Sequence, residues 1–213
     1  MQNLVTRFHL LLLFVTLALT AVGFLRIPHD FVFPAHWSGS LLDWVWPREV
    51  LLVAPLVQAG LIGCFFALGR ALSKNQYAKS QHILDPALTL LMTVVAATQL
   101  GFLLTGIGSD LDFIRFTAFG LGAALILLGV VLFEAERHTY AGLRMPWPVP
   151  TDQAWRVVHR SAGTAFCFAG VSLLALAWFD VGMGLLILGF ATALFAPALL
   201  ASATTLLMRG RAH

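Results

Sequence analysis

Long apolar runs separated by short polar stretches are the dominant pattern along this chain. An apolar run of about 18 or more residues is long enough to cross a hydrocarbon core of roughly 30 Å as a helix. Runs of this length occupy residues 8–25, 50–69, 86–108, 113–133, 161–179 and 181–208. The pattern therefore predicts an all-α, polytopic integral membrane protein with six transmembrane helices.

Local signals predict where several of these helices begin and end. Asp85-Pro86 predicts the start of the third helix, because proline is favoured in the first helical turn. So little chain separates the last two runs, around Asp180, that they must form a tight helical hairpin. The first run is expected to be retained, since Thr20-Ala21-Val22-Gly23 is a poor signal-peptidase site. No linker divides the chain, and residues 1–213 are predicted to form a single membrane domain.

The composition and the distribution of charge add an orientation. Of the 213 residues 59% are hydrophobic and only 11% are charged, whereas about a quarter are charged in soluble domains. Three basic residues, Arg26, Arg48 and Arg115, fall at one set of helix ends. The other ten of the 13 fall at the opposite set: Arg7, Arg70, Lys74, Lys79, Arg137, Arg144, Arg156, Arg160, Arg209 and Arg211. Because Lys and Arg in short loops stay in the cytoplasm, we expect an N-in/C-in topology, and no direct nucleic-acid binding is inferred from the basic pI.

Polar residues inside the runs are few. Gln58 and Gln99 lie at depth and are expected to hydrogen-bond between helices. An ion pathway would place acidic or histidine residues near the bilayer centre, and their absence there weakens a transporter interpretation. The sequence contains no HExxH or GxSxG motif, so no catalytic residue and no cofactor are predicted. Cys64 and Cys167 lie in the runs as small apolar residues, without a disulfide or CxxC pattern.

The predicted outer loop, residues 26–49, is long and rich in aromatic residues and proline, which argues that it is ordered. Nitrogen and oxygen ligands for a divalent metal are present at His29, Asp30, His36 and Asp43. Their spacing is irregular, however, and we favour a loop whose indoles lie at headgroup depth, at Trp37, Trp44 and Trp46. No metal site is therefore predicted.

The predicted inner loop, residues 134–160, carries the most specific local pattern. Thr151 or Asp152 is expected to cap a helix that continues into the fifth membrane span. In such a helix Trp155 and His159 lie four residues apart on one face, and Arg156 and Arg160 on the next. The two arginines can reach lipid phosphates or carboxylates of a partner, although an ordinary aromatic belt and a topology signal explain the same residues one by one.

Taken together, the two loops resemble the SdpI-like family of bacterial membrane proteins. The inner pattern of that family is matched at Gly142, Leu143, Arg144, Pro146, Trp147, Trp155, His159, Arg160 and Gly163. The outer stretch Pro34-Ala35-His36-Trp37-Ser38-Gly39, with Asp43, is similar to a domain of unknown function often found at the front of these proteins.

The resemblance implies a protein of the bacterial inner membrane that gives immunity to a secreted peptide toxin, by binding rather than catalysis. In the founding case the protein also holds a transcriptional repressor at the membrane. The expected toxin or envelope ligand would contact an outer-loop site at Pro34, His36, Trp37 and Asp43. A cytoplasmic repressor would contact the inner-loop site at Gly142, Arg144, Pro146, Trp147, Trp155, Arg156, His159 and Arg160. The alternative class is a small-molecule or lipid transporter, or a lipid-acting membrane enzyme.

Overall fold

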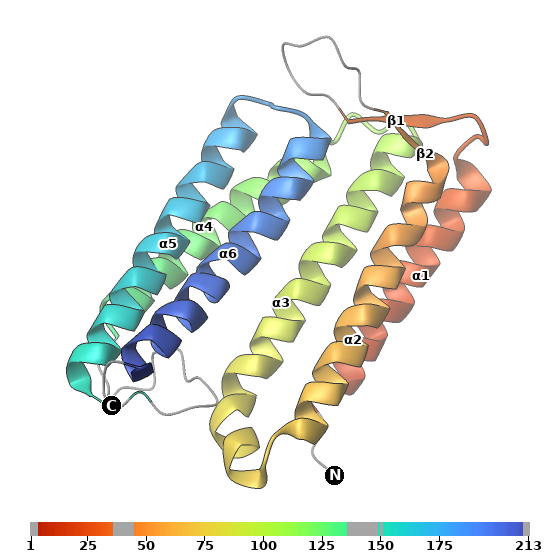
Figure 1. Cartoon of the computed structure of the whole chain (residues 1–213). Helices are drawn as coiled ribbons and strands as arrows, with labels where there is room; N and C mark the ends of the chain where they lie inside the picture. Colours follow the sequence, from red (N-terminus) through yellow and green to blue (C-terminus); the bar gives the residue numbers. More distant parts are fainter. Residues whose placement is uncertain (1–3, 36–44, 136–148, 150, 211–213) are drawn as a thin grey trace. The chain divides into compact units, whose positions relative to one another are not determined.

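The computed structural model describes residues 4–35, 45–135, 149 and 151–210. Six long helices dominate it (Figure 1): α1 (Arg7–Arg26), α2 (Val53–Ala71), α3 (Lys74–Gly106), α4 (Phe113–Phe133), α5 (Asp152–Trp178) and α6 (Met183–Gly210). Between α1 and α2 lie two short strands and a 3-10 helix: β1 (Val32–Pro34), β2 (Val45–Pro47) and η1 (Arg48–Leu52). All six long helices are long and apolar enough to cross a membrane. The predicted all-α fold with six transmembrane helices is confirmed, and the chain is a multi-pass membrane protein.

Contacts divide the chain into two compact units. The first unit comprises residues 1–117 and 180–187, and the second comprises residues 118–179 and 188–213.

In the first unit, hydrogen bonds made by polar side chains fix how α1, α2 and α3 are paired. His9 of α1 contacts Thr89 of α3, and Thr20 of α1 contacts Gln99 of α3. The partners are separated by 80 and 79 residues, so α1 and α3 run parallel. Gln58 of α2 contacts the Met92 carbonyl, and Gln99 contacts the carbonyl of Leu51, so α2 runs antiparallel to α3.

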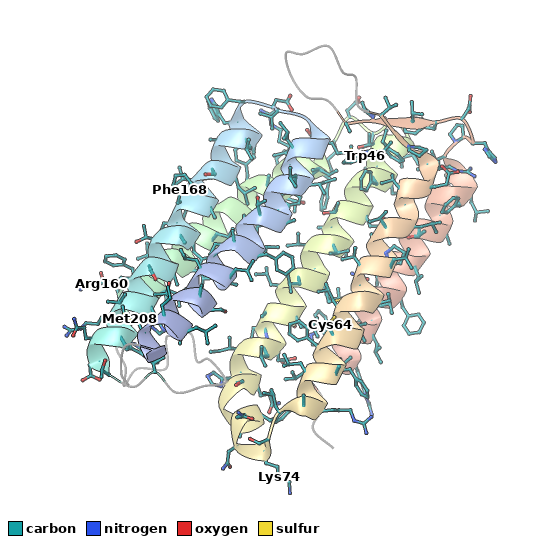
Figure 2. All side chains as sticks on the ribbon, in the orientation of Figure 1. Trp46, Cys64, Lys74, Arg160, Phe168 and Met208 are labelled. Atoms are coloured by element: carbon teal, nitrogen blue, oxygen red, sulfur yellow. The ribbon has the colours of Figure 1, made fainter. Side chains whose placement is uncertain are left out.

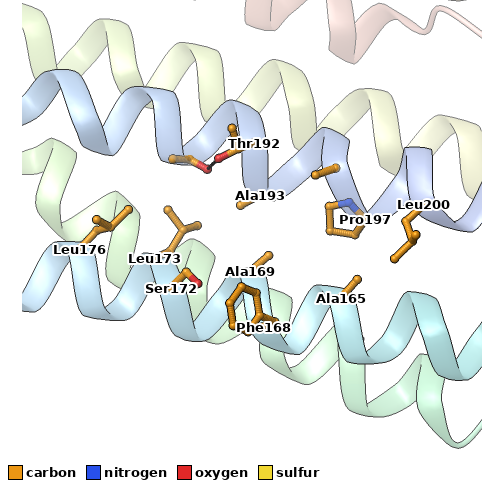
Figure 3. A pocket seen from close by; sticks show the side chains of 12 residues that line it. Ala165, Phe168, Ala169, Ser172, Leu173, Leu176, Thr192, Ala193, Pro197 and Leu200 are labelled. Atoms are coloured by element: carbon orange, nitrogen blue, oxygen red, sulfur yellow. Dashed lines mark hydrogen bonds between the residues drawn. The ribbon is translucent and has the colours of Figure 1, made fainter.

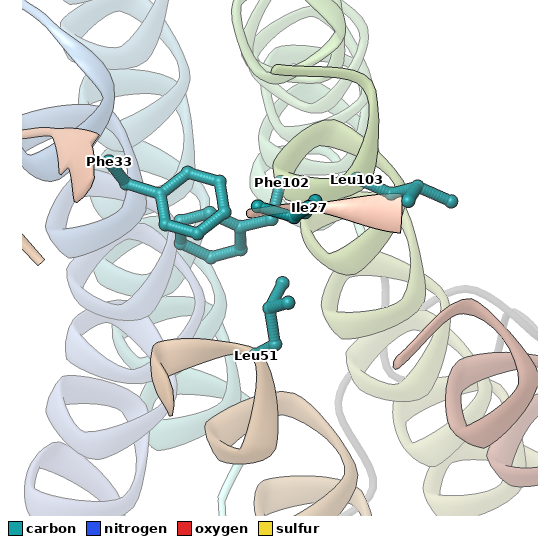
Figure 4. Close-up of a cluster of buried hydrophobic side chains, with 5 residues drawn as sticks. All are labelled: Ile27, Phe33, Leu51, Phe102 and Leu103. Carbon is teal, nitrogen blue, oxygen red and sulfur yellow. The ribbon is translucent and has the colours of Figure 1, made fainter. Parts of the chain in front are cut away.

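A small hairpin covers one end of this helix bundle. β1 and β2 pair antiparallel, with Phe33 opposite Trp46. The Phe33 ring meets the Phe102 ring edge-on, with the ring centres 5.0 Å apart. Figure 4 shows the cluster that these rings join, which consists of Ile27, Phe33, Leu51, Phe102 and Leu103. The outer loop is thus ordered, as expected, in the two strands that lie before and after residues 36–44.

The predicted start of the third helix at Asp85-Pro86 is wrong. Helix α3 begins at Lys74, and Pro86 lies inside it. The Ser73 hydroxyl accepts a hydrogen bond from the Gln76 N–H, and the Gln76 side chain accepts one from the Ser73 N–H, which forms a capping box. Pro86 has no backbone N–H, so it removes one helical hydrogen bond, the one to the His82 carbonyl. Prolines inside membrane helices are tolerated.

In the second unit, α4 and α5 cross at two pairs of glycines. A Cβ atom built on Gly122 would stand 2.9 Å from the Gly170 carbonyl oxygen, and one built on Gly129 would stand 2.7 Å from that of Gly163. The spacing of seven residues on both helices brings the backbones together twice along one seam. Gly120 has nothing within 4 Å of an added Cβ, so it takes no part in this crossing.

Helices α5 and α6 form the predicted hairpin, joined by residues 179–182. Asp180 and Gly182 both have positive φ, at 50° and 90°. In the second unit, Gly189 of α6 packs against Leu173 and Leu176 of α5.

Candidate functional site

The first turns of α5 form the best-defined part of the predicted inner-loop site. The Thr151 hydroxyl accepts a hydrogen bond from the Ala154 N–H at 3.1 Å, which is the predicted N-cap. The helix runs unbroken to Trp178, so it begins nine residues before the predicted membrane span. The last part of the predicted inner loop is therefore a rigid helical extension of α5.

One face of this extension is buried. The Trp155 indole and the His159 imidazole are stacked, with ring centres 4.0 Å apart and planes at 19°. The Trp155 Nε1–H donates to the Ala135 carbonyl just beyond α4, at 3.2 Å. His159 is only 1% exposed, and its Nδ1–H donates to the Trp155 carbonyl at 2.9 Å. The Trp155 indole ties the start of α5 to the end of α4, the His159 ring is buried against it, and neither ring is presented to an external partner.

The neighbouring face is exposed and basic. Arg156 and Arg160 lie four residues apart on it, as predicted. The Arg160 guanidinium lies over the Phe133 ring, 5.5 Å from its centre, which orients this side chain at the end of α4. Figure 2 shows Arg160 and Met208 near the same end of the second unit. Met208 packs against the small buried cluster of Val149, Ala154 and Trp155.

Several predicted site residues lie outside the described residues. These are His36, Trp37 and Asp43 of the outer loop, and Gly142, Arg144, Pro146 and Trp147 of the inner loop. Pro34, the remaining outer-loop candidate, is exposed in β1. The structure therefore brings together Trp155, His159 and Arg160, with Arg156 beside them on the exposed face. Within the described part of the chain, no cluster of three or more His, Cys, Asp or Glu side chains is arranged to hold a metal ion.

A buried polar network in the first unit includes both glutamines predicted to bond between helices. Gln58 donates to the Met92 carbonyl at 2.9 Å. Gln99 donates to the Thr20 hydroxyl at 2.9 Å and to the Leu51 carbonyl at 3.2 Å. The carbonyl of Leu51 lies four residues before Pro55, which has no N–H to offer it. Gln99 and, at 3.4 Å, the Thr20 hydroxyl thus donate to a carbonyl that Pro55 cannot serve, and the predicted hydrogen bonds of Gln58 and Gln99 between helices are confirmed.

His9 is a buried polar residue that the sequence pattern did not single out. Its side chain is fully buried. The backbone N–H of Thr6 donates to Nδ1 at 3.0 Å, so the ring hydrogen is on Nε2, which donates to the Thr89 hydroxyl at 2.9 Å. The Asp85 carboxylate is 3.7 Å from the same nitrogen. A single histidine at the start of an apolar run carries no spacing signal, and its partners on α3, Thr89 and Asp85, lie about 80 residues away.

Comparison with known proteins shows what this chain is similar to. The chain is 24% identical over 147 residues to the Immunity protein SdpI of Bacillus subtilis (strain 168), a match that covers 68% of this chain and 69% of the relative. No solved structure matches the chain. Residues 134–208, which include α5 and nearly all of α6, match the SdpI/YfhL protein family. The resemblance of this multi-pass membrane protein to the SdpI-like family is thus confirmed.

Proposed function

We propose that the protein protects its cell against a secreted peptide toxin and acts by binding rather than by catalysis. The observation that carries this proposal is the similarity to an immunity protein over 147 residues. The family segment, residues 134–208, also contains the only part of the predicted inner-loop site that the structure describes.

The basic face of α5 is the surface that we assign to a cytoplasmic partner. Arg156 and Arg160 are exposed side by side on a helix whose other face is fixed by Trp155 and His159. A guanidinium held in place loses little conformational entropy when it binds a carboxylate. A soluble protein with an acidic surface, such as a repressor, fits this arrangement. It requires the inner loop to face the cytoplasm of a bacterial inner membrane, with both termini inside, as the distribution of basic residues predicts.

The outer loop is the surface that we assign to the toxin. The exposed Pro34 leads directly into residues 36–44, where the other outer candidates lie. The hairpin base is anchored by Phe33 and Trp46, so this segment starts and ends at fixed points. A segment held at both ends is a suitable place for extracellular recognition.

Survival under toxin challenge tests the immunity proposal. A bacterium sensitive to a sporulation-delaying-type toxin would express either the wild-type protein or an Arg156→Ala, Arg160→Ala double variant, which changes only exposed side chains of the predicted inner-loop site. Protection by the wild type, lost in the double variant at equal membrane abundance, would establish immunity and its dependence on the inner loop. A well-expressed wild-type protein that gives no protection would remove toxin immunity of this kind as the function.

A further inference from the structure

The second unit contains an apolar groove between α5 and α6. Its volume is about 280 Å³. Small side chains form much of both walls, among them Ala165 and Ala169 of α5 and Ala193 and Ala196 of α6 (Figure 3). Phe168, which is 74% exposed, also lines it. Small residues on membrane helices allow another helix to approach closely.

Two polar groups interrupt the apolar walls of this groove. Pro197 in α6 has no N–H, so the Ala193 carbonyl four residues earlier loses its usual helical donor, and both residues line the groove. On the α5 wall lies the Ser172 hydroxyl, for which the described residues provide no hydrogen-bond partner. The hydroxyl of Thr192 is already engaged, because it donates to the Leu188 and Gly189 carbonyls.

The two prolines at positions 55 and 197 make the contrast clear. In the first unit, the carbonyl that Pro55 leaves without a donor receives one from Gln99. In the second unit, no described side chain donates to the Ala193 carbonyl. Polar groups left unsatisfied in hydrocarbon are costly, because no water replaces the missing partner. The Ala193 carbonyl is therefore an acceptor in the groove wall to which a bound molecule can donate.

The depth of these groups restricts what that molecule can be. At about 1.5 Å per residue, Ala193 lies roughly 15 Å into α6, close to the middle of a hydrocarbon core of roughly 30 Å. A lipid carries its polar groups at the headgroup and has only methylene groups at this depth. A membrane-inserted peptide can present a hydroxyl or carboxamide side chain there, which both donates and accepts.

We propose that this groove binds a membrane-inserted apolar peptide helix, whose hydroxyl or carboxamide side chain bonds to the Ala193 carbonyl and to Ser172. Resting on the proposed function, this assigns the groove to a segment of the toxin after it enters the bilayer. The toxin is then held inside the membrane by α5 and α6, both in the family segment.

Photocrosslinking combined with the survival assay tests this assignment. A photoreactive benzoylphenylalanine would replace Ala196, which lines the groove, or Ala198, which is exposed elsewhere on α6. The probe is a tagged sporulation-delaying-type toxin added to membranes that contain the full chain. We expect toxin adducts from position 196 and not from position 198.

Substitutions in the groove provide a second measurement. Ala169→Phe fills the groove and is expected to lower the tolerated toxin concentration about tenfold, equivalent to a loss of about 1.4 kcal/mol in binding. Ala175→Phe, at an exposed position of α5 outside the groove, should leave the tolerated toxin concentration unchanged. Ser172→Ala is expected to lower this concentration by roughly 2- to 10-fold, in line with the loss of one hydrogen bond.

Each outcome separates this inference from the proposed function. Protection with only lipid adducts, or adducts with a second copy of the chain, at position 196 would overturn the groove assignment and leave immunity standing. The same holds if Ala169→Phe protects fully at normal abundance. Toxin adducts at position 196 without protection would support the groove as a peptide site and remove immunity as the function. Neither adducts nor protection would overturn both.

Discussion

Gly129 of α4 and Gly163 of α5 lie backbone against backbone. A Cβ atom on Gly163 would stand 2.6 Å from the Gly129 carbonyl oxygen and 2.7 Å from the backbone nitrogen of Phe133. Contacts this close involve main-chain atoms, which cannot move aside as the end of a flexible side chain can. The seam also fixes the start of α5, because Phe133 is the residue on which the Arg160 guanidinium lies.

Gly163→Ala should therefore destabilise the protein by about 1–3 kcal/mol, the usual cost of overpacking a close contact. The measurement is thermal unfolding of the purified protein in detergent. Gly120→Ala is the matched control in α4, since nothing lies within 4 Å of an added Cβ there. A Gly163→Ala variant as stable as Gly120→Ala would show that the helices are not packed at this seam.

Replacement of Gln99 by leucine should also be destabilising, because it removes the donor to Thr20 and the shorter of two hydrogen bonds to the Leu51 carbonyl. An unsatisfied buried acceptor costs about 1–3 kcal/mol. Gln81→Leu, at an exposed position of the same helix, should have little effect. The loss would be followed by denaturant or thermal unfolding.

A second substitution tests whether the loss of stability in Gln99→Leu comes from the Leu51 carbonyl. Pro55→Ala restores a backbone N–H that can donate to the carbonyl of Leu51. In this background Gln99→Leu should cost less than it does alone, and the two variants should be non-additive. Additive losses would mean that the glutamine stabilises the unit in some other way.

Much of the fold could be predicted because the bilayer imposes a length on every span. Local spacing narrowed the cap to Thr151 or Asp152 and predicted the two faces of the following helix, and the structure places the cap at Thr151. The start of α3 was predicted wrongly because Pro86 outweighed a capping box at Ser73 and Gln76 that the sequence contains. In a membrane helix the proline signal is the weaker of the two.

Other features depend on contacts between segments far apart in the sequence. The spacing of seven between Gly122 and Gly129, repeated at Gly163 and Gly170, is visible in the sequence, but only the pairing of helices shows that Gly120 takes no part. The hairpin register and the bond between His9 and Thr89 likewise arise from tertiary packing. For the candidate site, sequence alone grouped Trp155 and His159 with the arginines, whereas burial separates a supporting face from an exposed one.

Trp155 variants should report on that supporting face. Trp155→Phe retains a ring next to His159 but removes the donor to the Ala135 carbonyl, at a cost of about 1–3 kcal/mol. Trp155→Leu removes the stacking as well and should be less stable again. Thermal unfolding of the three proteins should follow the order wild type, phenylalanine, leucine. Equal stability of all three would contradict a role for Trp155 in holding α4 to α5.

The exposed arginines should behave differently from the residues beneath them. Arg156→Ala and Arg160→Ala change exposed side chains, so membrane abundance and unfolding temperature should stay close to those of the wild type. If this face binds an acidic partner, each variant should lose the partner-dependent response, and Arg160→Lys should recover only part of it because lysine lacks the planar guanidinium. Gln153→Ala, also exposed in the first turn of α5, is the control and should retain the response.

His159→Ala, in contrast, should lower both stability and response together. Arginine variants that lose abundance in parallel with His159→Ala would show that the basic face is structural and that the partner binds elsewhere.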